Sequence, residues 1–174
     1  AIVLTHGHED HIGGIGYALR AFPNARVFGT RYTLSLVKNR LQEPFFQELK
    51  PELVSVEPNS QVEAGPFRFT YLSVTHSIPE SFGRAISTPV GTIVHSGDFK
   101  VDRGAPAPDN FDWEGFGKYR GKTRLLLADS TNALAEGRAG SEAEVYRTLR
   151  TLIERARERV VVSLFASNVG RVGE

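Results

Sequence analysis

The sequence of 174 residues contains no cysteine and no methionine, and it has a single tryptophan. Without cysteine the chain can form neither disulfides nor thiolate metal sites, and a cysteine nucleophile is excluded as well. The lack of cysteine fits a reducing compartment, so we expect a cytoplasmic protein. Because no initiator methionine is present, we expect the sequence to be an excerpt of a longer protein.

Long apolar runs and an excess of charge of one sign are also missing. No stretch approaches the roughly 18–20 apolar residues that a membrane span needs, and no signal segment is visible, so we expect no membrane association. The net charge of +1 gives no global attraction to nucleic acid, so any polyanion must be bound by local patches. With 40% hydrophobic and 24% charged residues, the composition is that of a globular chain with a sizeable core.

Histidine is scarce but concentrated. Three of the five histidines fall in the hexapeptide His-Gly-His-Glu-Asp-His at positions 6–11. An apolar run at residues 1–4 predicts a buried strand that leads directly into it. Imidazole and carboxylate groups are ligands that zinc, manganese and iron accept, so the hexapeptide predicts a metal site.

The spacing within the hexapeptide favours two metal ions. His6 and His8 are two positions apart, so in an extended segment both imidazoles lie on one face and can bind the same ion. Asp10 and His11 lie past the strand, where the chain turns into a helix, and suit a second ion better. A two-metal site of this kind also needs a bridging carboxylate and at least one further histidine.

Three more polar residues, His76, Asp98 and Asp129, each come directly after a predicted strand. Several strand ends can meet at one edge of a sheet, where active sites are often built, so we expect these side chains to approach the hexapeptide. His76 is the candidate for the further histidine, and Asp98 is the candidate for the bridging carboxylate.

Apolar periodicity and turn residues predict the other elements. Strands are expected at residues 1–4, 26–29, 53–56, 67–74, 84–87, 92–95, 125–128 and 160–165. A first helix begins near His11, and its glycine pair at 13–14 allows close packing. Thr30 can cap a second helix, and Ser141 with Glu144 forms a capping box for a third. The apolar side of the second helix consists of Leu34, Val37 and Leu41.

Five segments together resemble one known family. They are THGHEDHIGG at 5–14, VTHSIPES at 74–81, HSGDFK at 95–100, DSTNA at 129–133 and FASNV at 165–169. The first segment alone resembles the metallo-β-lactamase superfamily. All five, in this order and across essentially the whole chain, resemble the bacterial ribonuclease J family, which belongs to the beta-CASP branch of that superfamily.

The resemblance implies a role for each ligand candidate. The first metal ion would be held by His6, His8 and His76, the second by Asp10 and His11, and both by a bridging Asp98. Asp10, His76 and Asp98 would be the catalytic residues of this set. The implied cofactor is a pair of divalent ions, Zn²⁺ in the first place, with Mn²⁺ as the alternative that the same ligands accept.

Three further residues match motifs around the family's metal centre. Asp129 would support the centre by accepting a hydrogen bond from a histidine later in the family's chain. Ser167 and Asn168 match a strand-end segment near the family's RNA channel. Lys100 and Arg103 could meet an RNA backbone, whereas His95 and Trp113 are interpreted as structural.

The implied fold class is α/β. We expect a metallo-β-lactamase αββα sandwich over residues 1–132, without its early strands, and the start of an inserted beta-CASP domain over residues 133–174. The family's first motif would lie before Ala1, and its remaining metal ligand and the segment that binds the RNA 5′ phosphate would lie after Glu174. We therefore expect residues 1–174 alone to be inactive and poorly folded.

The function implied is RNA phosphodiester hydrolysis, as a 5′-to-3′ exonuclease with some endonuclease activity, in messenger RNA turnover and ribosomal RNA maturation. Single-stranded RNA would be the substrate, the full-length protein would form a homodimer, and partners in an RNA-degradation complex are conceivable. Two alternatives stay open. The first is another hydrolase on this fold, such as a DNA nuclease or a thioester or lactam hydrolase. The second is a catalytically dead scaffold subunit, which the complete set of expected ligands argues against.

Overall fold

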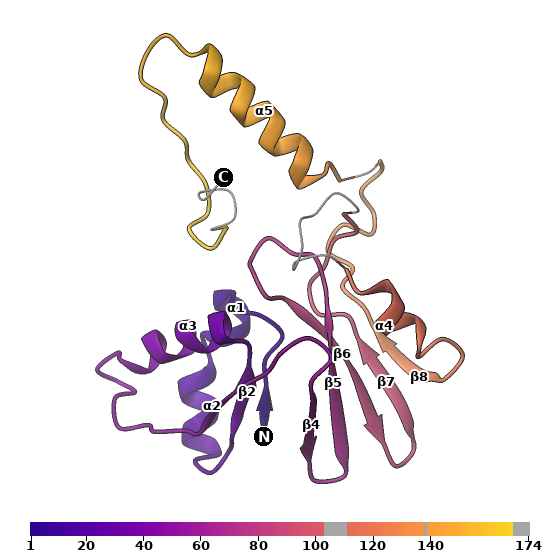
Figure 1. Ribbon diagram of the computed structural model, residues 1–174. Helices are drawn as coiled ribbons and strands as arrows, with labels where there is room; N and C mark the ends of the chain where they lie inside the picture. The colour runs from indigo at the N-terminus through magenta and orange to yellow at the C-terminus, as the bar shows by residue number, and fades with distance from the viewer. Residues whose placement is uncertain (103–110, 138, 169–174) are drawn as a thin grey trace.

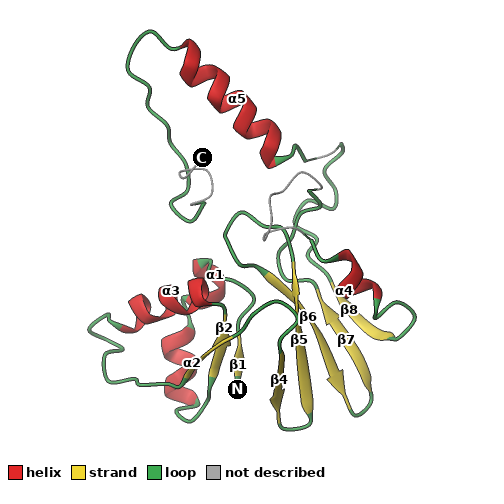
Figure 2. Cartoon of the chain, in the orientation of Figure 1, coloured by secondary structure: helices red, strands yellow, loops and turns green. Residues whose placement is uncertain are grey.

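The computed structural model describes residues 1–102, 111–137 and 139–168. Two sheets face each other, and helices cover their outer faces (Figure 1). The first sheet comprises three parallel strands, β1 Ile2–Val3, β2 Val27–Gly29 and β3 Leu53–Ser55. The second comprises, in spatial order, β4 Gln61–Ala64, β5 Phe67–Ser73, β6 Phe82–Thr88, β7 Gly91–His95 and β8 Thr123–Leu127. The described helices are α1 Glu9–Ile12, α2 Ile15–Ala21, α3 Arg31–Leu41, α4 Trp113–Gly117 and α5 Glu142–Arg155 (Figure 2).

Three apolar clusters hold these layers together. The first lies between the parallel sheet and helices α1 to α3, and its members include the fully buried Leu19 and Val37. The second lies between the two sheets, where Phe28 of one meets Tyr71 of the other. The third lies between the larger sheet and the segment around α4, and includes Leu72. The resulting order of helix, sheet, sheet and helix is the predicted αββα sandwich, so this prediction is confirmed.

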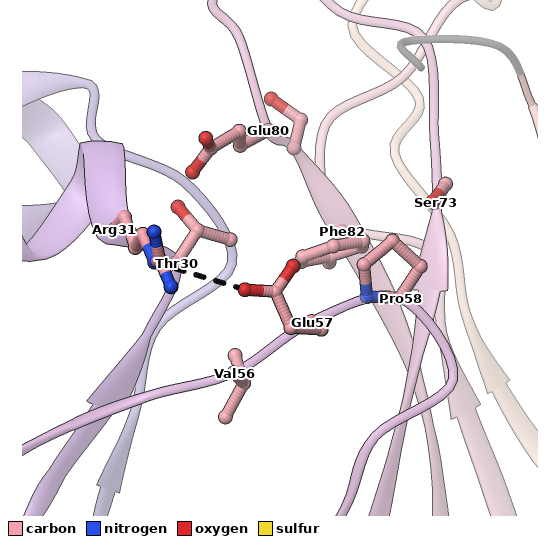
Figure 3. Close-up of a pocket in the computed structure, with 9 residues that line it drawn as sticks. Thr30, Arg31, Val56, Glu57, Pro58, Ser73, Glu80 and Phe82 are labelled. Atoms are coloured by element: carbon pink, nitrogen blue, oxygen red, sulfur yellow. Dashed lines mark ion pairs between the residues drawn. The ribbon is translucent and has the colours of Figure 1, made fainter. Parts of the chain in front are cut away.

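The start of α3 follows from local sequence. β2 ends at Gly29, and Thr30 follows it at the start of the helix (Figure 3). The hydroxyl of Thr30 accepts a hydrogen bond from the backbone N–H of Thr33, which caps the helix as predicted. The predicted apolar side of the helix is buried, with exposed fractions of at most 9% at Leu34, Val37 and Leu41. The β2–α3 junction lies at the same end of the sandwich as α1, which bears Asp10 and His11.

The larger sheet is a meander of antiparallel hairpins, with β8 added in parallel to β7. The predicted strands at 67–74, 84–87 and 92–95 are present as β5, β6 and β7. The short strand β4 was not predicted, because its alternate residues Gln61 and Glu63 are polar and exposed. Gly65 joins β4 to β5 at a φ of +59°, which glycine adopts without a steric cost.

The first predicted helix is divided in two, so the prediction of one continuous helix is wrong. α1 ends at Gly13, whose N–H bonds to the carbonyl of Glu9, and α2 begins after Gly14. Of the predicted glycine pair only Gly13 is in close contact, since a Cβ there would lie 2.7 Å from the carbonyl oxygen of Glu9, and a second close contact occurs at Gly16. A Cβ on Gly16 would lie 2.4 Å from the Phe46 ring, whereas a Cβ on Gly14 would meet nothing within 4 Å. The glycine pair therefore separates two helices, and Gly16 lets α2 approach Phe46.

The predicted strand at 160–165 is also wrong for the described structure. These residues form no strand, and Val161 and Phe165 are 85% and 87% exposed. An apolar run becomes a strand only where a neighbouring strand pairs with its backbone, and no described strand lies beside this one. β8 is present as predicted but is not buried, since it is an edge strand and Leu126 is 61% exposed.

Helix α5 begins at the predicted capping box, in which Ser141 and Glu144 exchange hydrogen bonds. It extends away from the sandwich in Figure 1, and none of its residues is buried. Within the described residues, no helix is both long and apolar enough to cross a lipid bilayer.

The exposed leucines of β8 lead to a prediction for the 174-residue chain on its own. We expect it to self-associate, because Leu125, Leu126 and Leu127 are all exposed on an edge strand. Leu126→Lys should lower the associated fraction measured by size-exclusion chromatography with light scattering. Val90→Lys is the control, since Val90 is 81% exposed in the turn between β6 and β7 and is not part of β8. A monomeric parent chain at all concentrations would contradict this expectation.

Candidate metal centre

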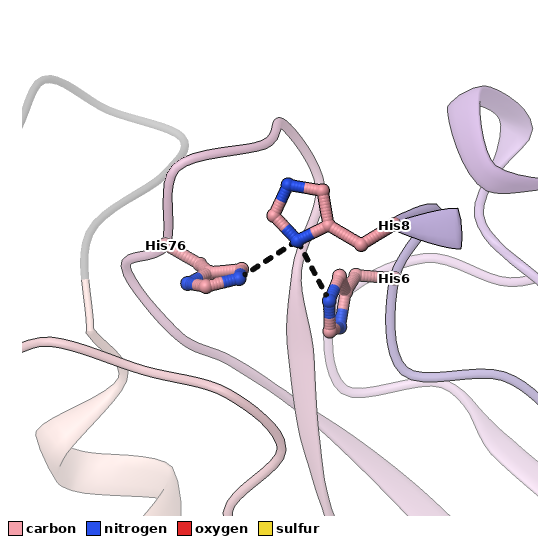
Figure 4. A group of neighbouring side chains, drawn as sticks. All are labelled: His6, His8 and His76. Atoms are coloured by element: carbon pink, nitrogen blue, oxygen red, sulfur yellow. Dashed lines mark hydrogen bonds between the residues drawn. The ribbon is translucent and has the colours of Figure 1, made fainter. Parts of the chain in front are cut away.

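Three imidazoles converge at one end of the sandwich. Nδ1 of His8 lies 3.1 Å from Nε2 of His6 and 3.1 Å from Nε2 of His76 (Figure 4). His6 and His8 follow β1, whereas His76 is reached 68 residues after His8, past the end of β5. The sequence predicted this meeting of strand ends, and the structure brings the three side chains together.

The three nitrogens are arranged as metal ligands are. Ligand atoms bound to a tetrahedral ion at roughly 2.0–2.1 Å are about 3.3 Å from one another. The two observed contacts of 3.1 Å are close to that value. Nδ1 of His8 has one proton or one lone pair, so it can form a good hydrogen bond with only one of the two nitrogens it contacts. A cation between the three imidazoles would satisfy all of them.

The tautomer and charge of His6 also suit a ligand. Nδ1 of His6 lies 3.0 Å from the hydroxyl of Thr5, a partner that can accept its proton and leave the lone pair on Nε2. Burial, reinforced by the neighbouring histidines, lowers the pKa of His6 to about 2. Burial also lowers the pKa of His8 and of His76. All three imidazoles are therefore neutral near pH 7, which is the form that binds metal.

A second group lies beside the first. Nε2 of His11 is 3.3 Å from Oδ2 of Asp98, and the same oxygen is 3.9 Å from Nε2 of both His6 and His76. Asp98 therefore faces both groups, as the predicted bridging role requires. Asp10 is more peripheral, because its carboxylate is 80% exposed and lies 3.5 Å from His11.

The donor set fits a pair of divalent cations. His6, His8 and His76 form one set of ligand atoms within 4.8 Å of one another, and His6, His11 and Asp98 form another. Neutral imidazole and carboxylate admit Zn²⁺ and Mn²⁺ alike. Asp10 stands outside both sets although its carboxylate lies 3.5 Å from His11, so its predicted role would require its exposed side chain to move closer to the other ligand atoms.

The loop that bears Asp98 depends on a glycine. Gly97 has a φ of +64°, and a Cβ there would lie 2.6 Å from the carbonyl oxygen of Phe82. Its N–H bonds to Nδ1 of His95 at 3.1 Å, which is the structural role expected for that histidine. Close backbone approach and a left-handed conformation together require glycine immediately before Asp98.

Asp129 supports this loop from the end of β8. Its Oδ2 accepts a hydrogen bond of 3.4 Å from the N–H of Phe99, next to Asp98, and its own N–H bonds to the hydroxyl of Ser96. Hydrogen bonds from Thr131 hold the pKa of the Asp129 carboxyl below its usual value. Asp129 thus holds the backbone beside Asp98, whereas the hydrogen bond from a later histidine stays a prediction.

A cavity of about 570 Å³ opens beside the centre. His8 and Asp10 line it on one side, and Tyr32 lines it from α3. Ser167 reaches the same cavity from the far end of the chain, whereas Asn168 is not among the lining residues. Of the two residues predicted to lie near an RNA channel, Ser167 is therefore the one beside the candidate ligands.

Lys100 forms ion pairs within the protein, whereas the sequence analysis considered it for a contact with RNA. Its Nζ lies 2.6 Å from Oε1 of Glu142 and 3.4 Å from Oδ2 of Asp102, so it ties the start of α5 to the sandwich. The other basic candidate, Arg103, lies outside the described residues.

Sequence analysis missed two side chains that shape the centre. Thr5 orients His6, but a threonine in a strand carries no sign of that contact. Arg84 of β6 is half-buried, donates to the backbone carbonyl of Val3 and is a minor cause of the lowered pKa of His6. The available signal for Arg84 was a charged residue at an inward position of an alternating strand.

Comparison with known families gives the following. The sequence pattern of the Metallo-beta-lactamase superfamily matches residues 1–163. Ribonuclease J of Mycobacterium tuberculosis is 43% identical over 174 residues, covering 99% of this chain and 30% of the relative. Ribonuclease J of Corynebacterium glutamicum is 40% identical, with coverages of 99% and 24%, and that of Thermus thermophilus is 38% identical, with coverages of 99% and 31%. The chain spans about a quarter to a third of the length of these curated relatives.

Solved structures agree on the fold. A crystal structure of a protein of unknown function from Enterococcus faecalis aligns with a TM-score of 0.70 at 19% identity, covering 98% of this chain and 43% of that one. Zn²⁺-bound PqqB from Methylobacterium extorquens aligns with a TM-score of 0.52 at 16% identity, covering 79% and 47%. At these identities the likeness concerns the fold alone.

The Gly97 geometry leads to a prediction about metal binding. Gly97→Ala should displace the Asp98 loop, because the added Cβ would clash with the Phe82 carbonyl, and should lower Zn²⁺ affinity by about 10-fold or more. The matched control is Gly121→Ala, since Gly121 has a φ of +71° but no atom within 4 Å of the added Cβ. Both variants should lose about 1–2 kcal/mol of unfolding free energy from backbone strain. Equal Zn²⁺ affinities, measured by competition with a chromophoric chelator, would contradict the placement of Asp98.

Proposed function

This chain belongs to the metallo-β-lactamase superfamily, and we propose that its protein is a metal-dependent ribonuclease that hydrolyses RNA phosphodiester bonds. The observation that carries the proposal is identity of 38–43% to ribonucleases J of three bacteria over 99% of the chain. The convergence of four histidines and Asp98 at one end of the fold supports it, because hydrolysis on this fold requires such a centre.

The residues have distinct tasks in this proposal. His6, His8 and His76 would hold one divalent ion, His11 and Asp10 would hold a second, and Asp98 would contact both. Such a metal pair, when bound, acts as a Lewis acid and makes water a nucleophile near pH 7. Thr5 holds the proton of His6 away from the ligand nitrogen, and Asp129 holds the backbone beside Asp98. Asp10, His76 and Asp98 are the residues we propose as catalytic.

The substrate would enter the cavity beside His8. That cavity borders the candidate ligands, is open to solvent and is lined by Tyr32 and Asn39 of α3 and by Ser167. A nucleobase can stack on an aromatic ring and pair with an amide, so this lining suits single-stranded RNA.

Finer properties rest on the resemblance to ribonuclease J. We propose 5′-to-3′ exonuclease action with some endonuclease activity, in messenger RNA turnover and ribosomal RNA maturation in the cytoplasm. Zn²⁺ is the proposed native ion, with Mn²⁺ as the alternative. Residues 1–132 would form the catalytic domain and residues 133–174 the start of a beta-CASP domain. A homodimer, with further partners in an RNA-degradation complex, is the proposed assembly.

Two other functions remain to be tested. A DNA nuclease or a thioester or lactam hydrolase could use the same fold and ligands, since fold does not determine substrate. A scaffold subunit would need no metal centre, and the intact convergence of His6, His8 and His76 argues against it.

One prediction of the proposed function concerns substrate choice. We expect the full-length protein, loaded with Zn²⁺ or Mn²⁺, to release mononucleotides from 5′-monophosphorylated single-stranded RNA faster than from the 5′-triphosphorylated form. The measurement pairs a labelled-RNA assay with elemental analysis of the purified protein. Cleavage of duplex DNA or of esters, with RNA left intact, would contradict the proposed function.

Another prediction of the proposed function concerns His76. His76→Ala removes one of three converging imidazoles. It should lower metal-dependent RNA cleavage by at least about 100-fold, because loss of a direct ligand should cost more activity than loss of a residue that only supports a ligand. The fold should persist, because His76 lies on a loop beyond β5. Lys38→Ala, an exposed change on α3, is the control and should leave cleavage unchanged. Unchanged turnover in His76→Ala would remove this residue from the centre.

A further inference from the structure

Glu80 has a backbone conformation that its residue type rarely adopts. Its φ is +56°, in the left-handed region that favours glycine. Among the described residues other than glycine, only Asn59 shares such a conformation, with a φ of +62°. Asparagine is often tolerated there, whereas glutamate is not. A glycine would adopt this turn without strain, so the presence of glutamate indicates that its side chain has a task.

The Glu80 carboxylate is docked on the start of α3. Its Oε2 accepts a hydrogen bond of 3.0 Å from the backbone N–H of Tyr32, in the first turn of that helix. The first-turn amides of a helix lack partners within the helix and carry partial positive charge, so a carboxylate is stabilised there. Thr30 caps Thr33 in the same turn, so the two side chains bond to different amides.

Figure 3 shows the surroundings of this contact. The Glu80 carboxylate points toward Thr30 and Arg31, across a cavity of about 140 Å³. Arg31 pairs with Glu57 on the other side of the cavity, at 3.9 Å. The cavity lies between the β2–α3 junction and the loop that follows β5, and the Glu80 side chain reaches from that loop to the helix.

The same loop bears His76, four residues before Glu80. The loop is closed by the bond from Val74 N–H to the Ser81 carbonyl at 3.0 Å, and within it the Ser81 hydroxyl bonds to the Ile78 carbonyl. Directly after it, the N–H of Phe82 bonds to the carbonyl of Thr5, the residue before His6. One end of the loop is thus tied to the strand that supplies His6, and Glu80 ties the loop to α3.

We propose that Glu80 is a positioning residue of the metal centre. By anchoring the His76 loop to the N-terminus of α3, its carboxylate keeps Nε2 of His76 beside Nδ1 of His8. Glu80 does not belong to the candidate ligand sets and acts through the position of His76. The inference rests on the metal centre of the proposed function and on no particular substrate.

The test separates backbone strain from positioning, using the full-length protein. Glu80→Gly removes both the carboxylate and the strained φ, so the thermal midpoint of the chelator-treated protein should stay near that of the parent. Zn²⁺ affinity, measured by competition with a chromophoric chelator, should nevertheless fall by about 10- to 100-fold. Glu80→Gln keeps an oxygen acceptor but loses the charge, so its affinity should fall less, by about 3- to 10-fold.

Asn59→Gly is the matched control, because it relieves the same kind of strain in the loop between β3 and β4 and should leave Zn²⁺ affinity unchanged. The visible spectrum of the Co²⁺-loaded protein gives a second readout, since its bands report ligand geometry. The Glu80 variants should alter this spectrum, and the Asn59 variant should not.

Parent-like Zn²⁺ affinity and Co²⁺ spectrum in Glu80→Gly would overturn the proposal. If that variant does not fold, undiminished affinity in Glu80→Gln would overturn it equally. Failure of the parent protein to bind Zn²⁺ or Co²⁺ would overturn the metal centre and this inference together. Metal binding that depends on Glu80, in a protein that leaves RNA intact, would support the positioning role while contradicting the proposed ribonuclease.

Discussion

The site depends on three imidazole nitrogens that are held close together where protonation is disfavoured. His6, His8 and His76 would repel one another if charged, and as neutral rings they cannot all form hydrogen bonds among themselves. Protonation of the rings does not resolve this conflict, because burial lowers the pKa of His6 to about 2. Folding of the surrounding sandwich must supply the free energy that holds the three rings together. A bound cation would lower this cost.

The sandwich supplies that free energy through contacts that join distant parts of the chain. The N–H of Leu4 bonds to Phe28 of β2, and the carbonyl of Thr5 accepts from Phe82 of β6, so the segment before His6 is fixed by both sheets. Between the sheets, Phe28 and Tyr71 pack in one apolar cluster. The ligand loops are therefore short projections from a packed framework, in which each side chain buried among apolar neighbours contributes about 1.5–3 kcal/mol.

Local features of this framework were predictable because their causes are local. The caps at Thr30 and Ser141, the alternation in β5 and the clustering of histidines at positions 6–11 can each be seen within a few residues. The close approach of Gly16 to Phe46 depends on residues far apart in the chain, and no local pattern contains it. The run at 160–165 failed for the same reason, since apolar character predicts a strand only where a partner strand exists.

The candidate site was predictable in its residue types and less so in its arrangement. Strand-end positions placed His76 and Asp98 near the hexapeptide, since the ends of neighbouring strands meet at one edge. The supporting contact of Thr5 had no such pattern, and the strand-end position of Asp129 did not indicate its bond to the N–H of Phe99, because a hydroxyl or carboxylate at a turn is more often a local capping group.

The two ligand sets differ in how far the fold prepares them. The first consists of three neutral imidazoles whose nitrogens already approach the spacing of bound ligands, so little rearrangement is needed before an ion enters. The second comprises His6, His11 and Asp98, of which Asp98 is 34% exposed, and the additional ligand proposed for it, Asp10, is 80% exposed and outside both sets. An exposed carboxylate loses side-chain freedom when it binds an ion, and that loss opposes binding. The first set is therefore the better prepared of the two, and in the proposed centre Asp98 would join it to a second ion.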